Sequence, residues 1–347
     1  MKKVTSLFLI LVSVLLLTSC GKAKLYKKTF LYFDTEITIS IFSNNHYAQV
    51  AFENIDETLS FYHSLTNRYE KEKDGIIGVY TINNSNGIKT TVSKELIDLI
   101  NDVLSYEYIL NDVGKPYFTI GIGALSDLWH PYFENDESSL FPDSELLSKT
   151  YNTDVSNIII DDKNNTITLK EGLKLDLGGV VKGYVSNLLV QKFDKENVKY
   201  IINMGSSSII TNIGNPKRKN NAYIIGLTNP NITKDGYVGS SIYGKINLPL
   251  NTAISTSGDY QKYIIYENKL YSSIIDPYTS YPVDTDIRSI SVLHLDPLYG
   301  DILSTTLFMM GKEKALSYAK AHNLEIILYT NTDEIFMTDG IKEIYSH

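Results

Sequence analysis

The stretch that most constrains the fold is Leu175–Tyr184, LDLGGVVKGY, in which an apolar strand pattern runs into two glycines. Helical apolar spacing follows at once and continues to about Phe193, which predicts a helix directly after the glycines. Backbone N–H groups at a helix N-terminus stabilise anions, glycine lets a ligand approach the backbone, and Lys182 adds a positive charge. The spacing matches neither G-x-G-x-x-G nor G-x-x-x-x-G-K-[ST], so neither nucleotide fingerprint applies. A phosphate-binding loop and a tight structural turn both stay open at this point.

The remaining periodicities alternate between groups of strands and single helices. Helical spacing covers His46–His63, a stripe from Ser93 to Asn111, the segment after the glycines, and a segment from about Asp301. Strands are predicted at Phe30–Phe42, Ile158–Asp161, Thr166–Leu169, Tyr200–Met204, Ala222–Leu227, Ser241–Leu248, Lys262–Tyr266, Arg288–His294, Leu324–Tyr329 and Glu334–Met337. Asn67–Asn86 and Gly114–Gly123 are predicted to be irregular. Because strands cluster and helices fall between the clusters, the predicted class is α+β with mixed or antiparallel sheets.

The charge of the chain argues against one class of partner. Its 347 residues carry a formal net charge of −8, and a composition of 43% hydrophobic and 21% charged residues is typical of a globular protein. Binding to a phosphate backbone needs clustered Lys and Arg, whereas the largest basic cluster, Lys217–Lys219, has the surroundings of a solvated loop. Nonspecific nucleic-acid binding is therefore not expected.

The N-terminus has the pattern of a secretory signal. Lys2 and Lys3 precede the apolar run Leu7–Leu17, which is too short to span a bilayer comfortably. The run ends in LTSCG, which resembles the lipobox of bacterial lipoproteins, and Cys20 is the only cysteine in the chain. We expect a signal peptide at 1–19, an acylated, palmitate-bearing Cys20, a tether at 20–29 and a functional domain at 30–347 on the outer face of the cell membrane. A plain signal peptide with an incidental cysteine is the alternative.

Asp301 and Thr305 form a candidate metal site. On a helix they are i and i+4 and share a face. A carboxylate with a hydroxyl suits a hard cation such as Mg²⁺, which keeps few protein ligands and takes others from a substrate phosphate. An aspartate near a helix N-terminus that only favours the helix dipole is the alternative.

Three further motifs are ambiguous when taken singly. Thr256-Ser257-Gly258-Asp259 is a polar turn pattern, Ile274–Thr279 is a strand end before an Asp-Pro turn, and Asn203–Ser208 is a Gly-Ser run after a strand. Turn formation explains each of them as well as ligand binding does. The six histidines show no metal-ligand spacing, and no G-x-S-x-G motif is present for nucleophilic chemistry.

The order of the motifs is more specific than any one of them. The blocks LDLGGVVKGY, NMGSSS, AISTSGDYQKY, YSSIIDPYTSYPV and SISVLHLDPLYGDILSTTLFMMG occur in this order, preceded by FDTEITI, RYEKEKDGIIGVYTIN and FTIGIGALSDLW. Together they resemble the ApbE family of FAD:protein FMN transferases, from about Phe30 to Gly311. The resemblance implies a T-fold-related architecture and a reaction that uses FAD and Mg²⁺. In that reaction the FAD pyrophosphate is split, FMN moves to a Thr or Ser hydroxyl of an extracytoplasmic flavin-carrying redox protein, and AMP is released.

The resemblance also assigns roles to single positions. Asp176 and Lys182 match flavin-nucleotide contacts, Gly179 matches a residue whose carbonyl binds the metal, and Asp301 and Thr305 match the side-chain metal ligands. Further positions in or near the FAD pocket are matched by Phe33, Tyr69, Tyr117, Phe118, Thr119, Thr256, Ser257, Gly258 and Asp259.

The chain departs from the family pattern at three places. Ser273 stands where the family has a histidine taken to activate the acceptor hydroxyl, and loss of a general base typically lowers a rate by about 10²–10⁴. Ser206-Ser207 replace a Gly-Gly pair, and Ser280 replaces a glycine. The pattern thus predicts FAD and Mg²⁺ binding more firmly than FMN transfer. The alternatives are an FAD-binding lipoprotein with impaired catalysis and an Mg²⁺-dependent FAD pyrophosphatase.

Overall fold

A computed structural model describes residues 23–73, 75–110, 117–134, 141–205, 207–214, 222–233 and 238–347. Its centre is an antiparallel sheet of eight strands in the order β1-β2-β6-β7-β10-β13-β14-β15. These strands are β1 (Lys24–Tyr32), β2 (Thr35–Ser43), β6 (Lys199–Asn203), β7 (Ser208–Thr211), β10 (Thr252–Gly258), β13 (Ile287–His294), β14 (Glu325–Thr330) and β15 (Ile335–Met337). The predicted α+β class is confirmed.

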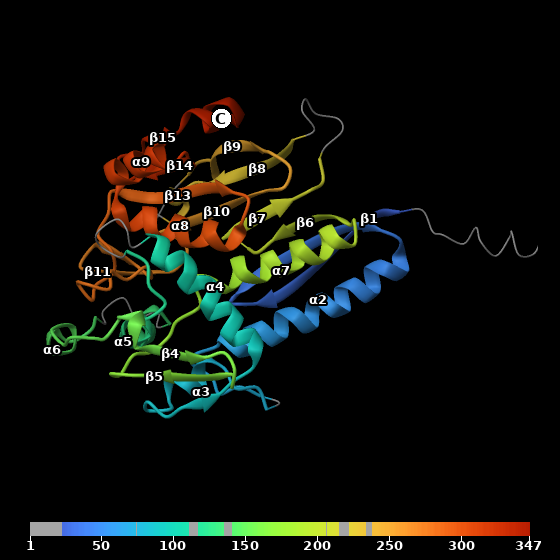
Figure 1. The fold of residues 1–347 in the computed structure, drawn as a ribbon. Coiled ribbons are helices and arrows are strands. Elements are labelled where there is room, and N and C mark those ends of the chain that lie inside the picture. The colour runs from blue at the N-terminus through green and yellow to red at the C-terminus, as the bar shows by residue number, and fades with distance from the viewer. Residues whose placement is uncertain are drawn as a thin grey trace, which may run out of the picture.

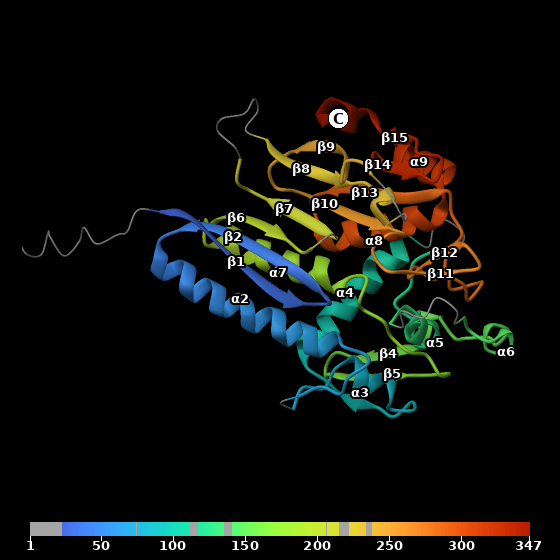
Figure 2. The same ribbon diagram turned by 180° about the vertical axis from the view of Figure 1, so that it is seen from behind.

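Helices cover one face of this sheet, and a smaller sheet packs on the other (Figure 1). The α-helices of the described residues are α2 (Asn45–Thr66), α3 (Val79–Asn83), α4 (Lys94–Leu110), α5 (Gly123–Phe133), α6 (Ser144–Leu147), α7 (Val181–Lys195), α8 (Pro297–Met310), α9 (Lys312–Ala321) and α10 (Asp339–Ile344). Of these, α2, α7, α8 and α9 pack on the large sheet, whereas α10 packs with β8 and β9. The small sheets are β8 (Tyr223–Thr228) with β9 (Ile242–Leu248) and β16 (Tyr345–Ser346), β11 (Tyr263–Tyr266) with β12 (Lys269–Ser272), and β3 (Thr90–Thr91) with β4 (Ile158–Asp161) and β5 (Thr166–Leu169). Figure 2 shows β8 and β9 beside β10 on the face away from α2.

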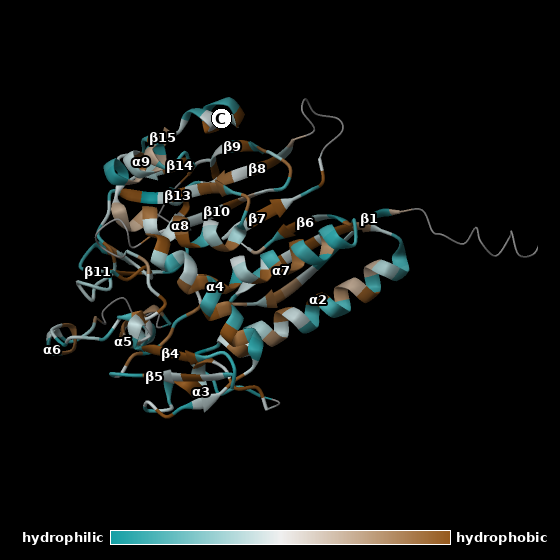
Figure 3. Ribbon diagram, viewed as in Figure 1, coloured by the Kyte–Doolittle hydropathy of each residue, from teal (hydrophilic) through white to brown (hydrophobic). Residues whose placement is uncertain are grey.

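Alternating residues build the core of the sheet. Ile37, Ile39 and Ile41 of β2 are fully buried, whereas α2 buries only the stripe that faces the sheet. Figure 3, coloured by hydropathy, shows brown, hydrophobic segments in β6 and β7 and alternating teal and brown segments along α2. Among the described residues, no helix is long and apolar enough to cross a membrane.

Helix α8 lies at the centre of the molecule. Asp296 caps it by accepting a hydrogen bond from the backbone N–H of Tyr299 at 3.1 Å, and Pro297 occupies the first turn, where its missing N–H is tolerated. Nearly every residue of α8 is buried against α7, β10 and β13. The helix therefore begins four residues before the predicted start at Asp301.

Two expectations about the first residues are corrected. The segment Phe30–Phe42 is two antiparallel strands rather than one, because Phe33 and Asp34 form a turn with φ of 53° and 55°. Residues 24–29, expected in a tether, belong to β1 and pair with β2.

Two helices also differ from the prediction. Asn67–Asn86, predicted to be irregular, contains α3, and α5 was not predicted. The signal peptide and Cys20 lie outside the described residues.

Candidate functional site

A cavity of about 930 Å³ lies where α5, the N-terminus of α7 and the C-terminal end of β10 meet. It gathers most of the site residues predicted from the sequence, together with Ser273: Phe33, Tyr69, Tyr117, Phe118, Thr119, Asp176, Gly179, Lys182, Thr256, Ser257, Gly258 and Thr305. These residues come from seven separate segments of the chain. Their convergence on one cavity supports a ligand-binding interpretation of motifs that turn formation alone also explained.

Asp301 lies behind the cavity wall. Its side chain is almost fully buried on α8 and accepts a hydrogen bond from the hydroxyl of Ser208 on β7. Its other carboxylate oxygen, Oδ2, has no hydrogen-bond partner among the described groups. Burial raises the pKa of Asp301 to about 6, against the opposing effects of Ser208 and of the nearby Lys182.

Thr305 stands one helical turn after Asp301 and faces the cavity. Its hydroxyl donates to the backbone carbonyl of Asp301 at 3.1 Å and lies 3.2 Å from the hydroxyl of Ser257 on β10. Helical spacing thus places the carboxylate and the hydroxyl on one face, as the sequence predicted.

The oxygen atoms at this wall fit a hard cation. A buried carboxylate oxygen without a partner is costly unless a cation or a donor completes it. The carboxylate of Asp301, the hydroxyl of Thr305 and the backbone of Gly179, which also faces the cavity, provide the oxygen-only chemistry that Mg²⁺ prefers. Within the described ranges, no three His, Cys, Asp or Glu side chains gather as a metal site, so any metal here would depend on hydroxyl, carbonyl or substrate oxygens.

The glycines after Asp176 differ in their structural roles. The Asp176 carboxylate accepts a hydrogen bond from the N–H of Gly178 at 2.8 Å, and a side chain at Gly179 would meet only Phe118, at 3.9 Å. Gly183 is the position without space, because an added Cβ would lie 2.7 Å from the Cα of Leu298. Glycine is therefore required at Gly183 for the crossing of α7 and α8, whereas Gly179 leaves backbone open to the cavity.

Lys182, in the first turn of α7, brings positive charge to the same wall. Burial lowers the pKa of its ammonium group, while Asp301 and Asp34 act in the opposite direction. Lys182 and Asp301 therefore interact electrostatically at the wall of the cavity.

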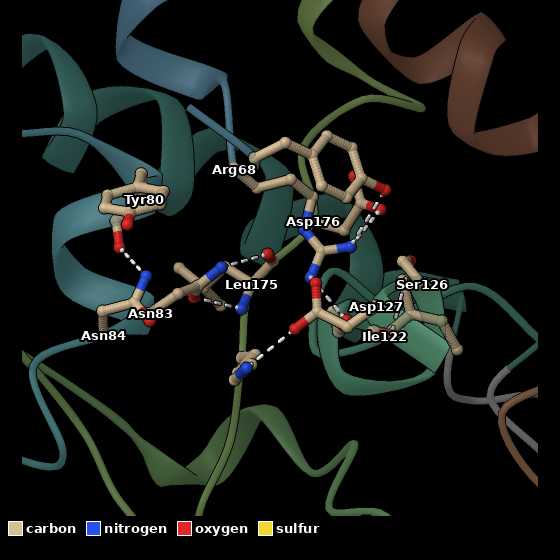
Figure 4. Close-up of polar contacts among 12 residues, drawn as sticks. Arg68, Tyr80, Asn83, Asn84, Ile122, Ser126, Asp127, Leu175 and Asp176 are labelled. Carbon is tan, nitrogen blue, oxygen red and sulfur yellow. Dashed lines mark hydrogen bonds and ion pairs between the residues drawn. The ribbon is translucent and has the colours of Figure 1, made fainter. Parts of the chain in front are cut away.

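Arg68 is the principal residue that the sequence did not predict. Its buried guanidinium forms ion pairs with Asp127 of α5 at 2.7 Å and with Asp176 at 3.4 Å, and it donates to the carbonyl of Gly123 (Figure 4). Lys174 adds a 2.7 Å ion pair to the second oxygen of Asp127. This network fixes the Asp176 carboxylate at the cavity.

The same turn is fixed from its other side by Asn83 of α3. The side-chain amide of Asn83 donates to the carbonyl of Leu175 at 2.9 Å and accepts from the N–H of Leu175 at 2.7 Å (Figure 4). Leu175 thus donates one hydrogen bond and accepts one, as in a paired strand, although residues 175–177 do not form the strand that the sequence predicted.

Aromatic side chains and histidines form the rim. Tyr69 stacks on His130 of α5 with ring centroids 3.6 Å apart. The backbone N–H of Phe33 donates to Nδ1 of His63 at 3.2 Å. Burial lowers the pKa of His130, which keeps its imidazole neutral near pH 7.

Asp259 differs from expectation, whereas Ser280 has the backbone of a glycine position, as its replacement of a family glycine implied. Asp259 is absent from the cavity lining, because its carboxylate forms an ion pair with Arg288 at 3.0 Å. Ser280 has a φ of 64°, a backbone conformation that favours glycine, and its carbonyl accepts a hydrogen bond from the Trp129 indole at 2.8 Å. Ser206 lies outside the described residues.

Comparisons with known proteins identify the family of the chain. A family model described as the ApbE family matches residues 33–328. The proteins named FAD:protein FMN transferase in Klebsiella pneumoniae (strain 342) and Haemophilus influenzae are each 27% identical to the chain. The matches cover 72% and 68% of this chain, and 73% and 67% of those proteins.

Two solved structures share the fold. The ApbE protein of Thermotoga maritima has a TM-score of 0.77 at 23% identity, covering 93% of this chain and 100% of its own. The flavin transferase ApbE of Vibrio cholerae has a TM-score of 0.74 at 20% identity, covering 93% of this chain and 99% of its own.

Proposed function

Because the chain belongs to the ApbE family, we propose that it is an FAD:protein FMN transferase. It splits the pyrophosphate of FAD, transfers FMN to a Thr or Ser hydroxyl of an extracytoplasmic flavin-carrying redox protein, and releases AMP. The observation that carries the proposal is the unpartnered Oδ2 of Asp301 beside a cavity lined by Thr305, Lys182 and Asp176.

The chemistry of the wall suits phosphoryl transfer, which depends mainly on positioning and on neutralising charge. Asp301, Thr305 and the carbonyl of Gly179 would hold Mg²⁺, which when bound supplies positive charge to the pyrophosphate. Lys182 places its ammonium at the same wall, and Arg68 holds Asp176 in a fixed orientation toward the nucleotide. The aromatic rim, with Phe33, Tyr69 and the Tyr117–Thr119 segment, offers flat surfaces for the rings of FAD.

We propose in addition that the mature chain starts at an acylated Cys20, which holds it on the outer face of the cell membrane. The signal pattern at 1–19 supports this proposal. The acceptor would then meet the enzyme outside the cytoplasm, and nucleic acid is not among its partners.

A second function is favoured by Ser273. This residue lines the cavity at the position of the family's histidine, and a serine hydroxyl is a poor base. A protein that binds FAD without transfer, or that hydrolyses it to FMN and AMP with water as the acceptor, is the alternative.

The test uses purified mature protein with FAD, Mg²⁺ and a flavin-acceptor domain, with covalent FMN read by fluorescence in a denaturing gel. Covalent FMN supports the transferase. Its absence together with tight FAD binding by calorimetry supports the binding protein, and AMP released without an acceptor supports the pyrophosphatase.

Asp301→Asn tests the cation site without relying on activity. We expect added Mg²⁺ to raise the melting temperature of the wild type but not that of Asp301→Asn, since a ligand stabilises only a protein that binds it. Asp339→Asn, an exposed aspartate on α10, is the matched control and should respond like the wild type. An equal Mg²⁺ response in Asp301→Asn would exclude Asp301 as a ligand.

A further inference from the structure

Transfer to a hydroxyl needs a group that accepts its proton, and the cavity contains few candidates. The lining histidines and carboxylates are His63, His130, Asp34, Glu70, Glu134 and Asp176. Hydroxyls and amides are poor bases at neutral pH, and the lining lysines, Lys182 and Lys262, interact with carboxylates that favour their charged form, so the choice lies among these six.

His63 is unsuitable as a base because the nitrogen that can accept a proton is already used in a hydrogen bond. Its Nδ1 accepts a hydrogen bond from the backbone N–H of Phe33 at 3.2 Å, so a neutral ring carries its proton on Nε2. The free edge of His63 therefore presents an N–H group to the cavity rather than a lone pair.

The carboxylates are less suitable than an imidazole. Lys262 forms an ion pair with Glu134. The hydrogen bond between these two side chains is the main reason that the pKa of Glu134 is lowered. Both oxygens of Asp176 accept hydrogen bonds, from Gly178 and from Arg68. Asp34 interacts electrostatically with Lys182, and Glu70 is exposed at the rim.

The imidazole of His130 differs from these groups in its hydrogen bonds. The structure gives neither ring nitrogen a hydrogen bond to a described group, and its nearest carboxylate oxygen, Oε1 of Glu134, lies 3.8 Å from Nδ1. Stacking on Tyr69 fixes the plane of the ring. The ring is neutral near pH 7 because burial lowers its pKa; Lys262 and Arg68 act in the same direction, and Glu134 and Asp127 oppose them.

Hydrogen bonds and an ion pair connect helix α5 to the segment that contains Ser273. The indole N–H of Trp129, the neighbour of His130, donates to the carbonyl of Ser280 at 2.8 Å. Lys262 forms an ion pair with Glu134, the residue that follows α5, and the carbonyl of Lys262 accepts a hydrogen bond from the N–H of Ser273 at 2.9 Å. His130 and Ser273 thus belong to one braced part of the cavity wall.

We propose that His130 is the general base of this enzyme, an inference that rests on the proposed transferase function. A ring nitrogen of His130 takes the proton of the acceptor Thr or Ser hydroxyl. The hydroxyl oxygen forms a bond to the phosphorus of the FMN half of FAD, and the bond from that phosphorus to the bridging oxygen breaks. AMP leaves with the electron pair, and His130 returns the proton to solvent.

The test compares His130→Gln with His322→Gln. His322 also stacks on a tyrosine, Tyr318, with centroids 4.0 Å apart, but it lies outside the cavity lining at the end of α9. We expect His130→Gln to lower kcat by about 10²–10⁴ while FAD affinity, measured by calorimetry, changes much less. His322→Gln should transfer FMN at the wild-type rate.

A pH profile separates a base from a structural role. Wild-type kcat should rise with pH through a pKa below the ordinary histidine value of 6.5, and His130→Gln should lose this limb. Added imidazole should restore part of the activity of His130→Ala. Loss of FAD binding in His130→Gln, with kcat and the acidic limb retained at saturating FAD, would instead assign His130 to the ring pocket and overturn the proposal.

The remaining outcomes also decide between the two proposals. Active wild type with an equally active His130→Gln overturns the base and leaves the transferase function standing. A wild type that binds FAD but transfers only after Ser273→His overturns both, because His130 would then be present without acting. If His130 serves as the base, Ser273→His should raise wild-type transfer little and should restore transfer in His130→Gln.

Discussion

Gly183→Ala tests whether the close crossing of α7 and α8 supports the proposed cation site. An added methyl carbon would lie 2.7 Å from the Cα of Leu298 and from the carbonyl oxygen of Pro297, whereas ordinary contact begins at 3.4 Å. Both obstacles are backbone atoms, so the two helices must separate by about 0.7 Å.

Such overpacking typically costs about 1–3 kcal/mol, and the higher helix propensity of alanine returns up to about 1 kcal/mol. We therefore expect the free energy of unfolding to fall by about 1–2 kcal/mol and the melting temperature by roughly 2–6 °C. The methyl group would also lie 2.8 Å from Oδ2 of Asp301, so the stabilisation by added Mg²⁺ should weaken as well.

Urea unfolding followed by circular dichroism, with and without Mg²⁺, measures both effects. Gly179→Ala is the matched control for stability, because its methyl group would meet only Phe118 at 3.9 Å; its unfolding free energy should stay within about 0.5 kcal/mol of the wild type. A Gly183→Ala protein as stable as the wild type would refute the close crossing.

Two other changes have outcomes set by burial. Arg68→Gln leaves Asp127 and Asp176 without their buried partner and should lower the unfolding free energy, measured by urea titration, by about 3 kcal/mol. The control is Lys89→Gln, which removes an exposed ion pair with Asp161 and should change the unfolding free energy by less than about 1 kcal/mol. Burial raises the pKa of Glu107 from 4.5 to about 7, so the folded state binds its proton more tightly than the unfolded state does. Stability should therefore fall by up to about 3 kcal/mol as pH rises from about 4.5 to 7, and Glu107→Gln should remove most of this slope in unfolding curves at pH 5 and 8; an unchanged slope would contradict the assignment.

The sequence predicts those parts of the site that depend on neighbours along the chain. Asp301 and Thr305 are one helical turn apart, so local spacing was enough to pair them. Asp176, Gly179 and Lys182 lie within seven positions, but their roles came from the resemblance to the family. The predicted class and most of the strands also followed from periodicity.

Arg68 shows what local spacing cannot provide. Its partners Asp127 and Asp176 are 59 and 108 positions away, and only the fold brings them together. The same is true of His130, whose neighbour Tyr69 belongs to a separate loop.

The strand β10 shows a different limit. Its residues TAISTSG were interpreted around Thr256–Asp259 as a turn, because small hydroxyl residues are typical of turns. In the structure β10 is a central strand, and α8 packs so closely on it that a Cβ at Gly300 would lie 2.7 Å from the hydroxyl of Ser255. Small side chains are needed there for packing, and this requirement arises only when the helix is in place.

One part of the cavity wall belongs to the core helix α8 and another part to loops. This difference affects which substitutions the protein can tolerate as its sequence changes. Asp301 and Thr305 belong to α8, whose other residues fill the core, so a mutation that shifts them also threatens folding. The loops of the wall, with Tyr69 and the Ser273–Ser280 segment, contribute mainly to a small buried cluster around Trp129 rather than to the main core. Substitutions in these loops can therefore accumulate while the protein still folds, whereas the part of the wall that contains Asp301 and Thr305 stays under the same constraint as stability.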